Sequence, residues 1–338
     1  MPVLDGNALI EDRVGAIRGL HERVGNMRGQ LDLSGGIDSG VLLGLLVRAL
    51  GPQNVTAVYS NIHSGEEFLD RARLAAKAFG VALVEIDLTE VFDGLLELMD
   101  ASLATAGFDR VEIAQRIERD KTVLGSLRSC LRAPVGRGYN RMTGGGIRHG
   151  TGNECEDRFI RFYQKGGDGE VDTNPIAMLG KGEVFQLARA LGVPRELIDA
   201  MPSPDLHGIG NDHNDEDELR ALTGVAWTYS RIDFETGEYT KVGSIERMSR
   251  FLDGEHEGVI FGAQAPTDAL FAKLAQEGQT AFPGMDVKEI EDLLRSTRRL
   301  EATSRHKLNP NIPALGDRET LVQSGILTDV LPDCQSTR

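Results

Sequence analysis

Cysteine is scarce in this chain of 338 residues, and its spacing matches no metal-binding or disulfide pattern. Cys130, Cys155 and Cys334 form an odd set with no CxxC pair. This spacing excludes a disulfide framework and a zinc ribbon from the predictions, and it disfavours sulfur-transfer chemistry. We therefore expect other residue types to carry the function.

Long apolar runs and an excess of basic charge are missing as well. No apolar run is long enough to cross a bilayer, and the first residues carry acids where a secretory signal would carry bases. The chain has 37 Lys and Arg against 52 Asp and Glu, a net charge of −15. Such a surface repels nucleic acid and anionic membranes, so neither is an expected partner. We expect a cytoplasmic protein that, with 40% hydrophobic residues, buries a sizeable core.

Strands and helices alternate in the first part of the chain. Apolar patterning predicts an N-terminal helix over 5–27, and then strands at 30–33, 55–60 and 81–86 with helices at 41–50, 66–79 and 89–105. This alternation predicts a parallel sheet with right-handed crossovers. Ligands in such folds bind at the carboxyl ends of the strands.

The later elements are less regular. Helices are predicted over 112–132, 182–191 and 289–305, with a glycine-rich segment at 136–152 and a polar, acidic loop at 205–218. Turn signals over 235–285 indicate an insertion or small subdomain. The last thirty residues are predicted to be irregular.

A short glycine-rich loop follows the first strand. The sequence Ser-Gly-Gly-Ile-Asp-Ser occupies 34–39 and precedes a helix. Glycines let backbone N–H groups approach a phosphate, and the start of the helix adds positive potential. Ser34 and Ser39 add hydroxyl donors, and Asp38 could hold Mg²⁺. The loop lacks the Gly-Lys-Ser/Thr of a Walker A motif. It predicts a phosphate site, with an ordinary glycine turn as the alternative.

This loop resembles the pyrophosphate loop of the N-type ATP pyrophosphatases, which split ATP between its α and β phosphates. Further motifs narrow the resemblance to the ammonia-dependent NAD synthetase family, of which the chain is identified as a divergent member. They are Gly-Thr-Gly-Asn at 150–153, Glu156, Gly-Asp-Gly at 167–169, Asp172, Lys181, Pro-Ser-Pro-Asp-Leu at 202–206, the acidic run at 215–219 and His306-Lys307.

The resemblance implies a fold and an activity. The fold is a three-layer α/β sandwich with a doubly wound parallel sheet, of the adenine nucleotide alpha hydrolase-like type. Residues 1–234 would form the synthetase domain, 235–285 the insertion, and 286–338 a C-terminal helix and closing segment. The activity is C–N bond formation: ammonia amidates a carboxylate through an acyl-adenylate, converting deamido-NAD to NAD with release of AMP and pyrophosphate. The family also implies a homodimer with the acid substrate near the subunit boundary.

Residue roles follow by the same resemblance. Asp38, Lys181 and Glu156 would be catalytic, with Asp38 and Glu156 as Mg²⁺ ligands. ATP would be bound by Ser34, Gly36, Asp38, Ser39, Thr151, Lys181 and Ser203. The acid substrate would be bound by Arg128, Arg132, Lys165, Asp172, His306 and Lys307.

Several residues depart from the family pattern, mainly on the acid-binding side. Ser126 and Cys130 stand where the family has Asn and Arg, and Leu308 replaces an Arg. Neither Ser nor Cys can replace a guanidinium clamp on a phosphate or carboxylate. These departures leave open a relative that amidates another carboxylic acid, and a non-catalytic nucleotide-binding regulator is a further alternative. No glutaminase domain is recognisable, so nitrogen would come from ammonia, an amine or a separate glutaminase.

Some residues also have purely structural interpretations. Asp168 and Asp172 could cap turns, and Lys181 could be a surface charge. The acidic run at 212–218 is more typical of a solvated loop or helix start than of a metal site. Trp227 and Tyr229 are predicted to be packing residues, and His149 an ordinary loop histidine.

Overall fold

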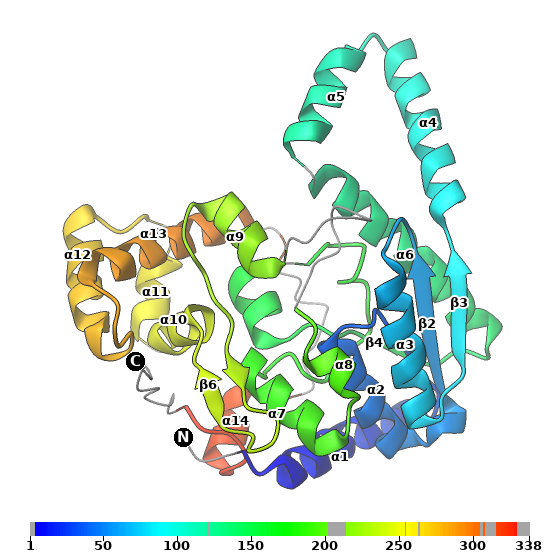
Figure 1. Ribbon diagram of the computed structural model, residues 1–338, viewed down its shortest axis with the longest axis horizontal. Coiled ribbons are helices and arrows are strands. Elements are labelled where there is room, and N and C mark those ends of the chain that lie inside the picture. The colour runs from blue at the N-terminus through cyan, green and yellow to red at the C-terminus, as the bar shows by residue number, and fades with distance from the viewer. Residues whose placement is uncertain are drawn as a thin grey trace.

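A four-stranded parallel sheet organises the N-terminal part of the molecule (Figure 1). The structure is a computed structural model that describes residues 4–120, 122–161, 163–201, 214–253, 255–262, 264–304, 307 and 316–329. The strands are β1 (Gly29–Asp32), β2 (Val55–Asn61), β3 (Leu83–Asp87) and β4 (Ile147–His149). Their spatial order is β3-β2-β1-β4. The chain builds outward from β1 and then returns to add β4 on the other side, which confirms the doubly wound sheet.

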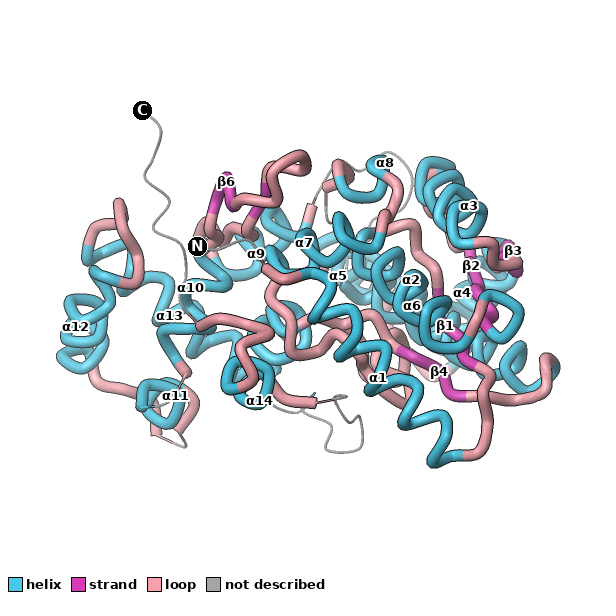
Figure 2. Tube along the Cα trace, turned by 90° about the horizontal axis from the view of Figure 1, so that it is seen from below, coloured by secondary structure: helices cyan, strands magenta, loops and turns pink. Residues whose placement is uncertain are grey.

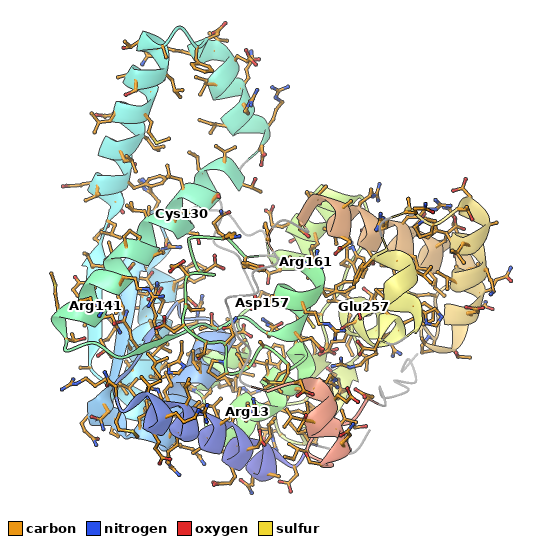
Figure 3. The ribbon with its side chains drawn as sticks, turned by 180° about the vertical axis from the view of Figure 1, so that it is seen from behind. Arg13, Cys130, Arg141, Asp157, Arg161 and Glu257 are labelled. Carbon is orange, nitrogen blue, oxygen red and sulfur yellow. The ribbon has the colours of Figure 1, made fainter. Side chains whose placement is uncertain are left out.

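Helices cover both faces of this sheet, and side chains on both faces of β1 are buried. Leu31 of β1 is buried in the main hydrophobic core with residues of α1 (Gly6–Val24), α2 (Ile37–Leu50), α3 (Glu66–Phe79) and α7 (Lys181–Leu191). Gln30 points the opposite way and donates to the Gly136 carbonyl oxygen of α6 (Thr122–Met142) over 2.7 Å. Figure 3 shows α6, with Cys130 and Arg141, lying across that second face. The result is the predicted three-layer arrangement.

The region from 112 to 152 differs from the sequence prediction. Two helices, α5 (Arg110–Arg119) and α6, replace the single predicted helix over 112–132. Asp120 ends α5, and its carboxylate accepts from the Thr122 backbone N–H over 3.0 Å, which starts a new helix. The glycine-rich segment is helical as far as Met142 because this stretch of α6 packs on the sheet; only the glycines at 144–146 form a turn.

Helices also replace two segments that were predicted to be irregular. The acidic run is helical from α9 (Asp215–Thr223) onward, since Asn214 caps the helix by accepting from the Asp217 N–H over 3.1 Å. The rest of that predicted loop, 205–213, lies outside the described residues. Near the C-terminus, α14 (Arg318–Gln323) packs Leu321 into the main core.

The helical hairpin of α4 (Thr89–Thr105) and α5 extends away from the sheet (Figure 1). Phe92 is the one buried residue of α4, and α5 has none. Several apolar side chains of the hairpin are exposed: Val91, Leu98, Met99, Phe108 and Val111. Within the described part of the chain, no helix is long and apolar enough to cross a membrane.

A second hydrophobic core lies at the opposite end of the molecule from β3 (Figures 1 and 2). It is built by a π-helical turn (Glu154–Ile160), α9, α10 (Ser244–Leu252), α11 (Glu255–Ile260), α12 (Asp268–Glu277) and α13 (Val287–Ser304). Trp227 is buried there and donates its indole N–H to Ser296 Oγ over 3.0 Å, so its predicted packing role is confirmed. Residues of the 235–285 segment therefore share one core with residues on either side of it.

Two short elements complete the fold. The antiparallel pair β5 (Arg231–Ile232) and β6 (Tyr239–Lys241) lies against α7, and α8 (Arg195–Ile198) packs near α2 and α3. Gln186 of α7 donates to the Gly237 carbonyl oxygen over 2.8 Å, and Arg189 Nε donates to that of Phe234 over 2.6 Å. These hydrogen bonds hold the turn between β5 and β6 against α7.

A buried histidine pair joins α1 to β4. The Nε2 atoms of His21 and His149 lie 3.0 Å apart, and His149 Nδ1 contacts Thr173 Oγ1 at 2.9 Å. Burial, reinforced by the neighbouring His21, lowers the pKa of His149 to about 3. Burial also lowers the pKa of His21, although its contact with the Asn26 carbonyl opposes this. His149 is therefore a buried structural residue at the end of β4, directly before the Gly-Thr-Gly-Asn segment at 150–153.

This pair predicts a loss of stability in mild acid. The unfolded chain binds a proton at His149 below pH 6.5, whereas the folded chain does not until about pH 3. The free energy of unfolding should thus fall as the pH drops, by about 2 kcal/mol at pH 5 from His149 alone. Urea denaturation at pH 7 and pH 5 measures this loss. His149→Asn should flatten the dependence, whereas His63→Asn, at a half-buried histidine just beyond the end of β2, should not flatten it. Equal slopes in all three proteins would contradict the assignment.

Candidate functional site

The glycine-rich loop lies at the carboxyl end of β1, where the strand order reverses between β1 and β4. Ser39 Oγ donates to the Gly36 carbonyl oxygen over 2.9 Å, and Ser34 Oγ donates to Ser39 Oγ over 3.2 Å. Gly35 has a φ of +81°, and a Cβ atom there would lie 2.2 Å from the Phe68 carbonyl oxygen. The loop therefore turns tightly into the N-terminus of α2, with its backbone held by its own hydroxyls.

Lys181 joins this loop to the other end of the site. Its Nζ lies 2.7 Å from Asp38 Oδ2 and 2.7 Å from Glu156 Oε1. Asn153 donates to Asp38 Oδ1 over 2.9 Å, and its own Oδ1 accepts from the Glu156 N–H over 3.1 Å. The Lys181 side chain is 1% exposed, against 16% and 19% for the two carboxylates. Lys181 is thus an interior charge, which excludes the surface-lysine alternative.

Burial and charge act in opposite directions on this cluster. Burial alone would lower the pKa of Lys181, but the carboxylates of Asp38 and Glu156 outweigh it and raise the pKa. Burial raises the pKa of Glu156, an effect that the Lys181 charge opposes and Asp38 strengthens. Burial, and then the Glu156 charge, raise the pKa of Asp215 to about 7. Lys181 therefore remains a cation, and Asp215 holds its proton to a higher pH than an ordinary aspartate does.

A cavity of about 570 Å³ opens beside this cluster. It extends from the loop and the end of β2 past α6 to the last turn of α13. Arg71, Arg161 and Lys307 add positive charge to its lining. The Arg161 guanidinium pairs with Glu301, and Lys307 Nζ donates to the Tyr163 carbonyl oxygen over 2.9 Å. The space is wide enough for a nucleotide-sized ligand.

The structure brings most of the sequence-predicted site residues to this cavity. Those that line it are Ser34, Gly36, Asp38, Thr151, Glu156, Lys181, Arg132 and Lys307. Ser39 lies buried beneath the loop and holds its turn instead. Ser203 and His306 lie outside the described residues.

Three predicted acid-binding residues lie elsewhere. Arg128 is buried in α6 and donates to Ser64 Oγ over 3.3 Å. Asp172 accepts from Arg137 Nη1 over 2.9 Å and from the Arg148 backbone N–H over 2.7 Å, so it links α6 to β4 and does not cap a local turn. Lys165 is exposed, and none of the three is among the residues that line the cavity.

Sequence reasoning missed four residues of the site. Asn153 was part of a recognised motif, but its link to Asp38 depends on the return of β4 beside β1. Arg71 of α3 donates to the Gly35 carbonyl oxygen over 3.0 Å. No sequence motif around Arg71 predicts this contact. Asp215 and Arg161 line the cavity because of how α9 and the π-helical turn pack. Only the acidic run offered a signal for Asp215.

The carboxylate oxygens of Asp38 and Glu156 suit a hard cation that takes few of its ligands from the protein. Among the residues the structure describes, no group of three or more His, Cys, Asp or Glu side chains is arranged to hold a metal ion. Asp38 and Glu156 nevertheless present carboxylate oxygens to one cation, Lys181, at the edge of the cavity. Mg²⁺ typically takes one or two carboxylates and completes its shell with phosphate oxygens and water. The residues present therefore fit Mg²⁺ bound together with a phosphate ligand.

The loop geometry predicts different costs for two glycine substitutions. Gly35→Ala combines positive φ with a backbone clash, so the free energy of unfolding should fall by about 3 kcal/mol. Gly80→Ala is the matched control, because Gly80 has a φ of +69° but no atom near the position of an added Cβ. It should cost about 1 kcal/mol. Urea denaturation of both variants tests this, and equal losses would show that Phe68 does not confine the loop.

Comparison with known proteins gives one consistent family. The family model described as NAD synthase matches residues 9–235. An NH(3)-dependent NAD(+) synthetase of Thermoplasma volcanium is 28% identical over 234 residues, covering 67% of this chain and 84% of that protein. One from Alkaliphilus oremlandii is 31% identical over 202 residues, covering 58% of this chain and 72% of that protein.

Solved structures share the fold. An NMN synthetase from Francisella tularensis superposes with a TM-score of 0.61 at 21% identity, covering 91% of this chain and 99% of that chain. An NAD+ synthetase from Burkholderia pseudomallei gives a TM-score of 0.52 at 22% identity, covering 91% of each chain. The sheet, the loop at its switch point and the matched sequence agree: the chain belongs to the NAD synthase family, as a divergent member and a ligase that forms a C–N bond.

Proposed function

We propose that this protein amidates the carboxylate of deamido-NAD with ammonia, consuming ATP and forming NAD, AMP and pyrophosphate. The contact of Lys181 with both Asp38 and Glu156 beside the glycine-rich loop carries the proposal. A buried cation and two carboxylates beside the N-terminus of α2 suit the binding of a triphosphate. The curated relatives, named NH(3)-dependent NAD(+) synthetases, support the same reaction.

The reaction divides into two displacements. A carboxylate oxygen of the acid attacks the α-phosphorus, and the bond from that phosphorus to the bridging oxygen of pyrophosphate breaks. Ammonia then attacks the acyl carbon, AMP leaves with its oxygen, and the nitrogen loses a proton. Because the acyl-adenylate is already activated, no protein nucleophile is needed. Positioning and exclusion of water decide the rate.

The residues of the cluster take separate roles. Ser34 and the backbone around Gly36 bind phosphate oxygens, and Thr151 contacts ATP at the edge of the cavity. Lys181 neutralises charge that develops on the phosphoryl oxygens and the departing pyrophosphate. Asp38 and Glu156 would hold Mg²⁺, which when bound adds further positive charge to the phosphates. Lys307 closes the far side of the cavity.

A second candidate substrate is a different carboxylic acid. Cys130 stands where the family resemblance expects an Arg, and the neutral side chains of Ser126 and Ser129 line the cavity. Arg132 is therefore the cation that α6 contributes to the lining. One structure of the same fold is named an NMN synthetase, which makes the acid form of NMN the first alternative to test. The amidation chemistry is the same in either case.

One assay separates these possibilities. Purified protein is incubated with ATP, Mg²⁺ and ammonium plus either deamido-NAD or nicotinate mononucleotide, and products are read by mass spectrometry. NAD formed in equal amount to AMP supports the leading proposal. Amidation of the mononucleotide alone would replace it with the alternative. Absence of AMP with every carboxylic acid tried would favour a nucleotide-binding regulator.

Lys181 should be essential to that turnover. Lys181→Met removes the cation that neutralises the phosphates, so kcat should fall by about a hundredfold or more. Lys77→Met, at an exposed lysine on the outer helix α3, is the matched control and should keep full activity. Steady-state kinetics with ATP varied measures both. A Lys181→Met enzyme with the kcat of the wild type would remove Lys181 from the mechanism.

The exposed hairpin supports the homodimer that the family resemblance implies. Leu98 is 69% exposed and Phe108 59% exposed, and contact with a second copy would remove both side chains from water. The hairpin precedes the N-terminal end of α6, where Thr122 and Ser126 line the cavity. A second copy covering α4 and α5 would therefore lie next to the acid-binding side of the site.

Charges on the hairpin should break such a dimer. Leu98→Glu with Phe108→Glu should produce monomers, because two charges would be buried without partners. Met142→Glu, at an 83% exposed residue of the opposite end of α6, should leave the dimer intact. Sedimentation velocity measures the mass in each case. A dimeric double variant would place the interface elsewhere, and a monomeric wild type would refute the dimer.

A further inference from the structure

The helix that carries Lys181 begins without a capping side chain of its own. Its N-cap is Gly180, and Lys181, Gly182 and Glu183 form its first turn. Glu183 Oε2 accepts from the Gly180 N–H over 2.8 Å, which satisfies one backbone donor. The Gly182 N–H still requires an acceptor, because the first N–H groups of a helix have no partner within it. The position of Lys181 therefore depends on groups outside α7.

Glu246 of α10 supplies that acceptor. The Gly182 N–H donates to Glu246 Oε1 over 2.6 Å, and Ser230 Oγ donates to Glu246 Oε2. Glu246 and Ser230 are both buried. A Cβ atom on Gly180 would lie 2.6 Å from Glu246 Oε1, so the bare glycine makes room for the carboxylate. A negative group at a helix N-terminus is also stabilised by the helix dipole.

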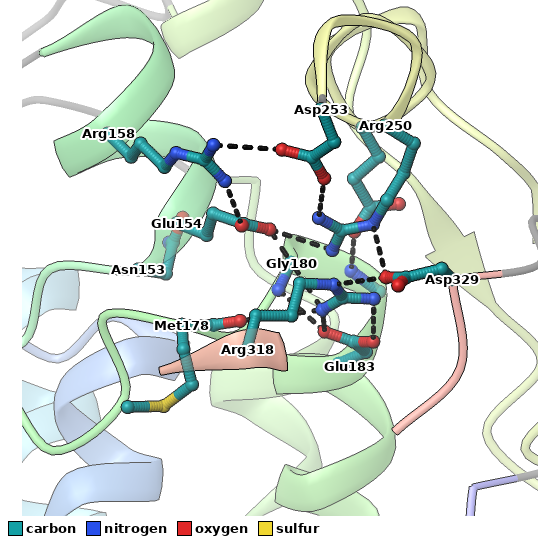
Figure 4. A network of polar contacts seen from close by, with 12 residues as sticks. Asn153, Glu154, Arg158, Met178, Gly180, Glu183, Arg250, Asp253, Arg318 and Asp329 are labelled. Atoms are coloured by element: carbon teal, nitrogen blue, oxygen red, sulfur yellow. Dashed lines mark hydrogen bonds and ion pairs between the residues drawn. The ribbon is translucent and has the colours of Figure 1, made fainter. Parts of the chain in front are cut away.

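A second contact from the C-terminal region holds the same turn. Arg318 of α14 binds Glu183 in a bidentate pair, with Nη1 to Oε2 at 2.8 Å and Nη2 to Oε1 at 2.9 Å. Figure 4 shows this pair within a network that also contains Glu154, Arg158 and Arg250. Arg250 of α10 reaches Glu154 Oε2 at 2.7 Å. The π-helical turn that carries Glu156 is thus tied to the same helices.

We propose that Glu246 is a positioning residue for Lys181, so that the region beyond residue 235 sets the geometry of the catalytic cation. Glu246 and Arg318 both lie outside the stretch that matches the NAD synthase family model. The inference rests on the proposed function for the role of Lys181. The inference gives the 235–285 segment a role: through Glu246 it caps the N-terminus of α7, the helix that carries Lys181.

Three substitutions test the proposal. Glu246→Ala should lower kcat by about tenfold or more while changing the KM for ATP little, because the lysine loses alignment with the reacting phosphate. Glu246→Gln should restore most of the rate, since its amide oxygen still accepts from the Gly182 N–H and its NH₂ group can donate to Ser230. Ser296→Ala is the matched control: it removes the buried hydrogen-bond partner of Trp227 in the second core and leaves the Glu246 contact with the Gly182 N–H in place. It should lower the melting temperature and leave kcat unchanged.

The outcomes distinguish positioning from general stability. The proposal would be overturned if Glu246→Ala kept the kcat of the wild type. It would also be overturned if Ser296→Ala lost as much kcat per degree of lost melting temperature as Glu246→Ala does, because a general loss of stability would then explain both variants.

A labelling experiment tests the same idea without turnover. Lys181 is 1% exposed, so an amine-reactive ester should modify it slowly in the wild type and several times faster in Glu246→Ala. Equal labelling rates would count against Glu246 whatever the activity. If the wild type makes no AMP with any acid, the proposed function fails, while the labelling result still decides the role of Glu246.

Discussion

The paired burial of Lys181 with Asp38 and Glu156 is the constraint on which the site depends. A buried charge is tolerated only when opposite charges and hydrogen bonds compensate its desolvation. Here each partner comes from a different segment: the loop after β1, the π-helical turn after β4, and the start of α7. None of the three segments can move far without leaving a charge unpaired. The ion pairs therefore hold the loop, the turn and the helix in register.

The doubly wound sheet makes this meeting possible. Because β4 returns beside β1, the two loops that follow these strands leave the same edge of the sheet. Asn153, four residues beyond the end of β4, then reaches Asp38 in the first turn of α2. The sheet brings the segments after β1 and β4 to the same edge, and the contacts of Lys181 with Asp38 and Glu156 hold these two segments together.

The C-terminal region completes the site from the other side. Glu246 and Arg318 support the first turn of α7, while the end of α13 and Lys307 line the cavity. The side formed by α6 is less charged, since Arg128 is turned inward and Ser126 and Ser129 face the cavity. The loop side and the α6 side of the cavity are thus built differently, and under the proposed function the α6 side would select the acid.

The sequence alone determined the alternating strands and helices and the loop at 34–39, because these depend on local periodicity and a short motif. Glu156 and Lys181 were predicted from the family resemblance. The sequence did not reveal that α6 continues to Met142, that Asp172 is held by Arg137, or that Arg71 supports the loop. Nor did any pattern connect Glu246 with Lys181, since 65 positions of chain separate them. Such contacts arise only when distant segments pack and their buried polar groups must find partners, and that condition belongs to the tertiary structure.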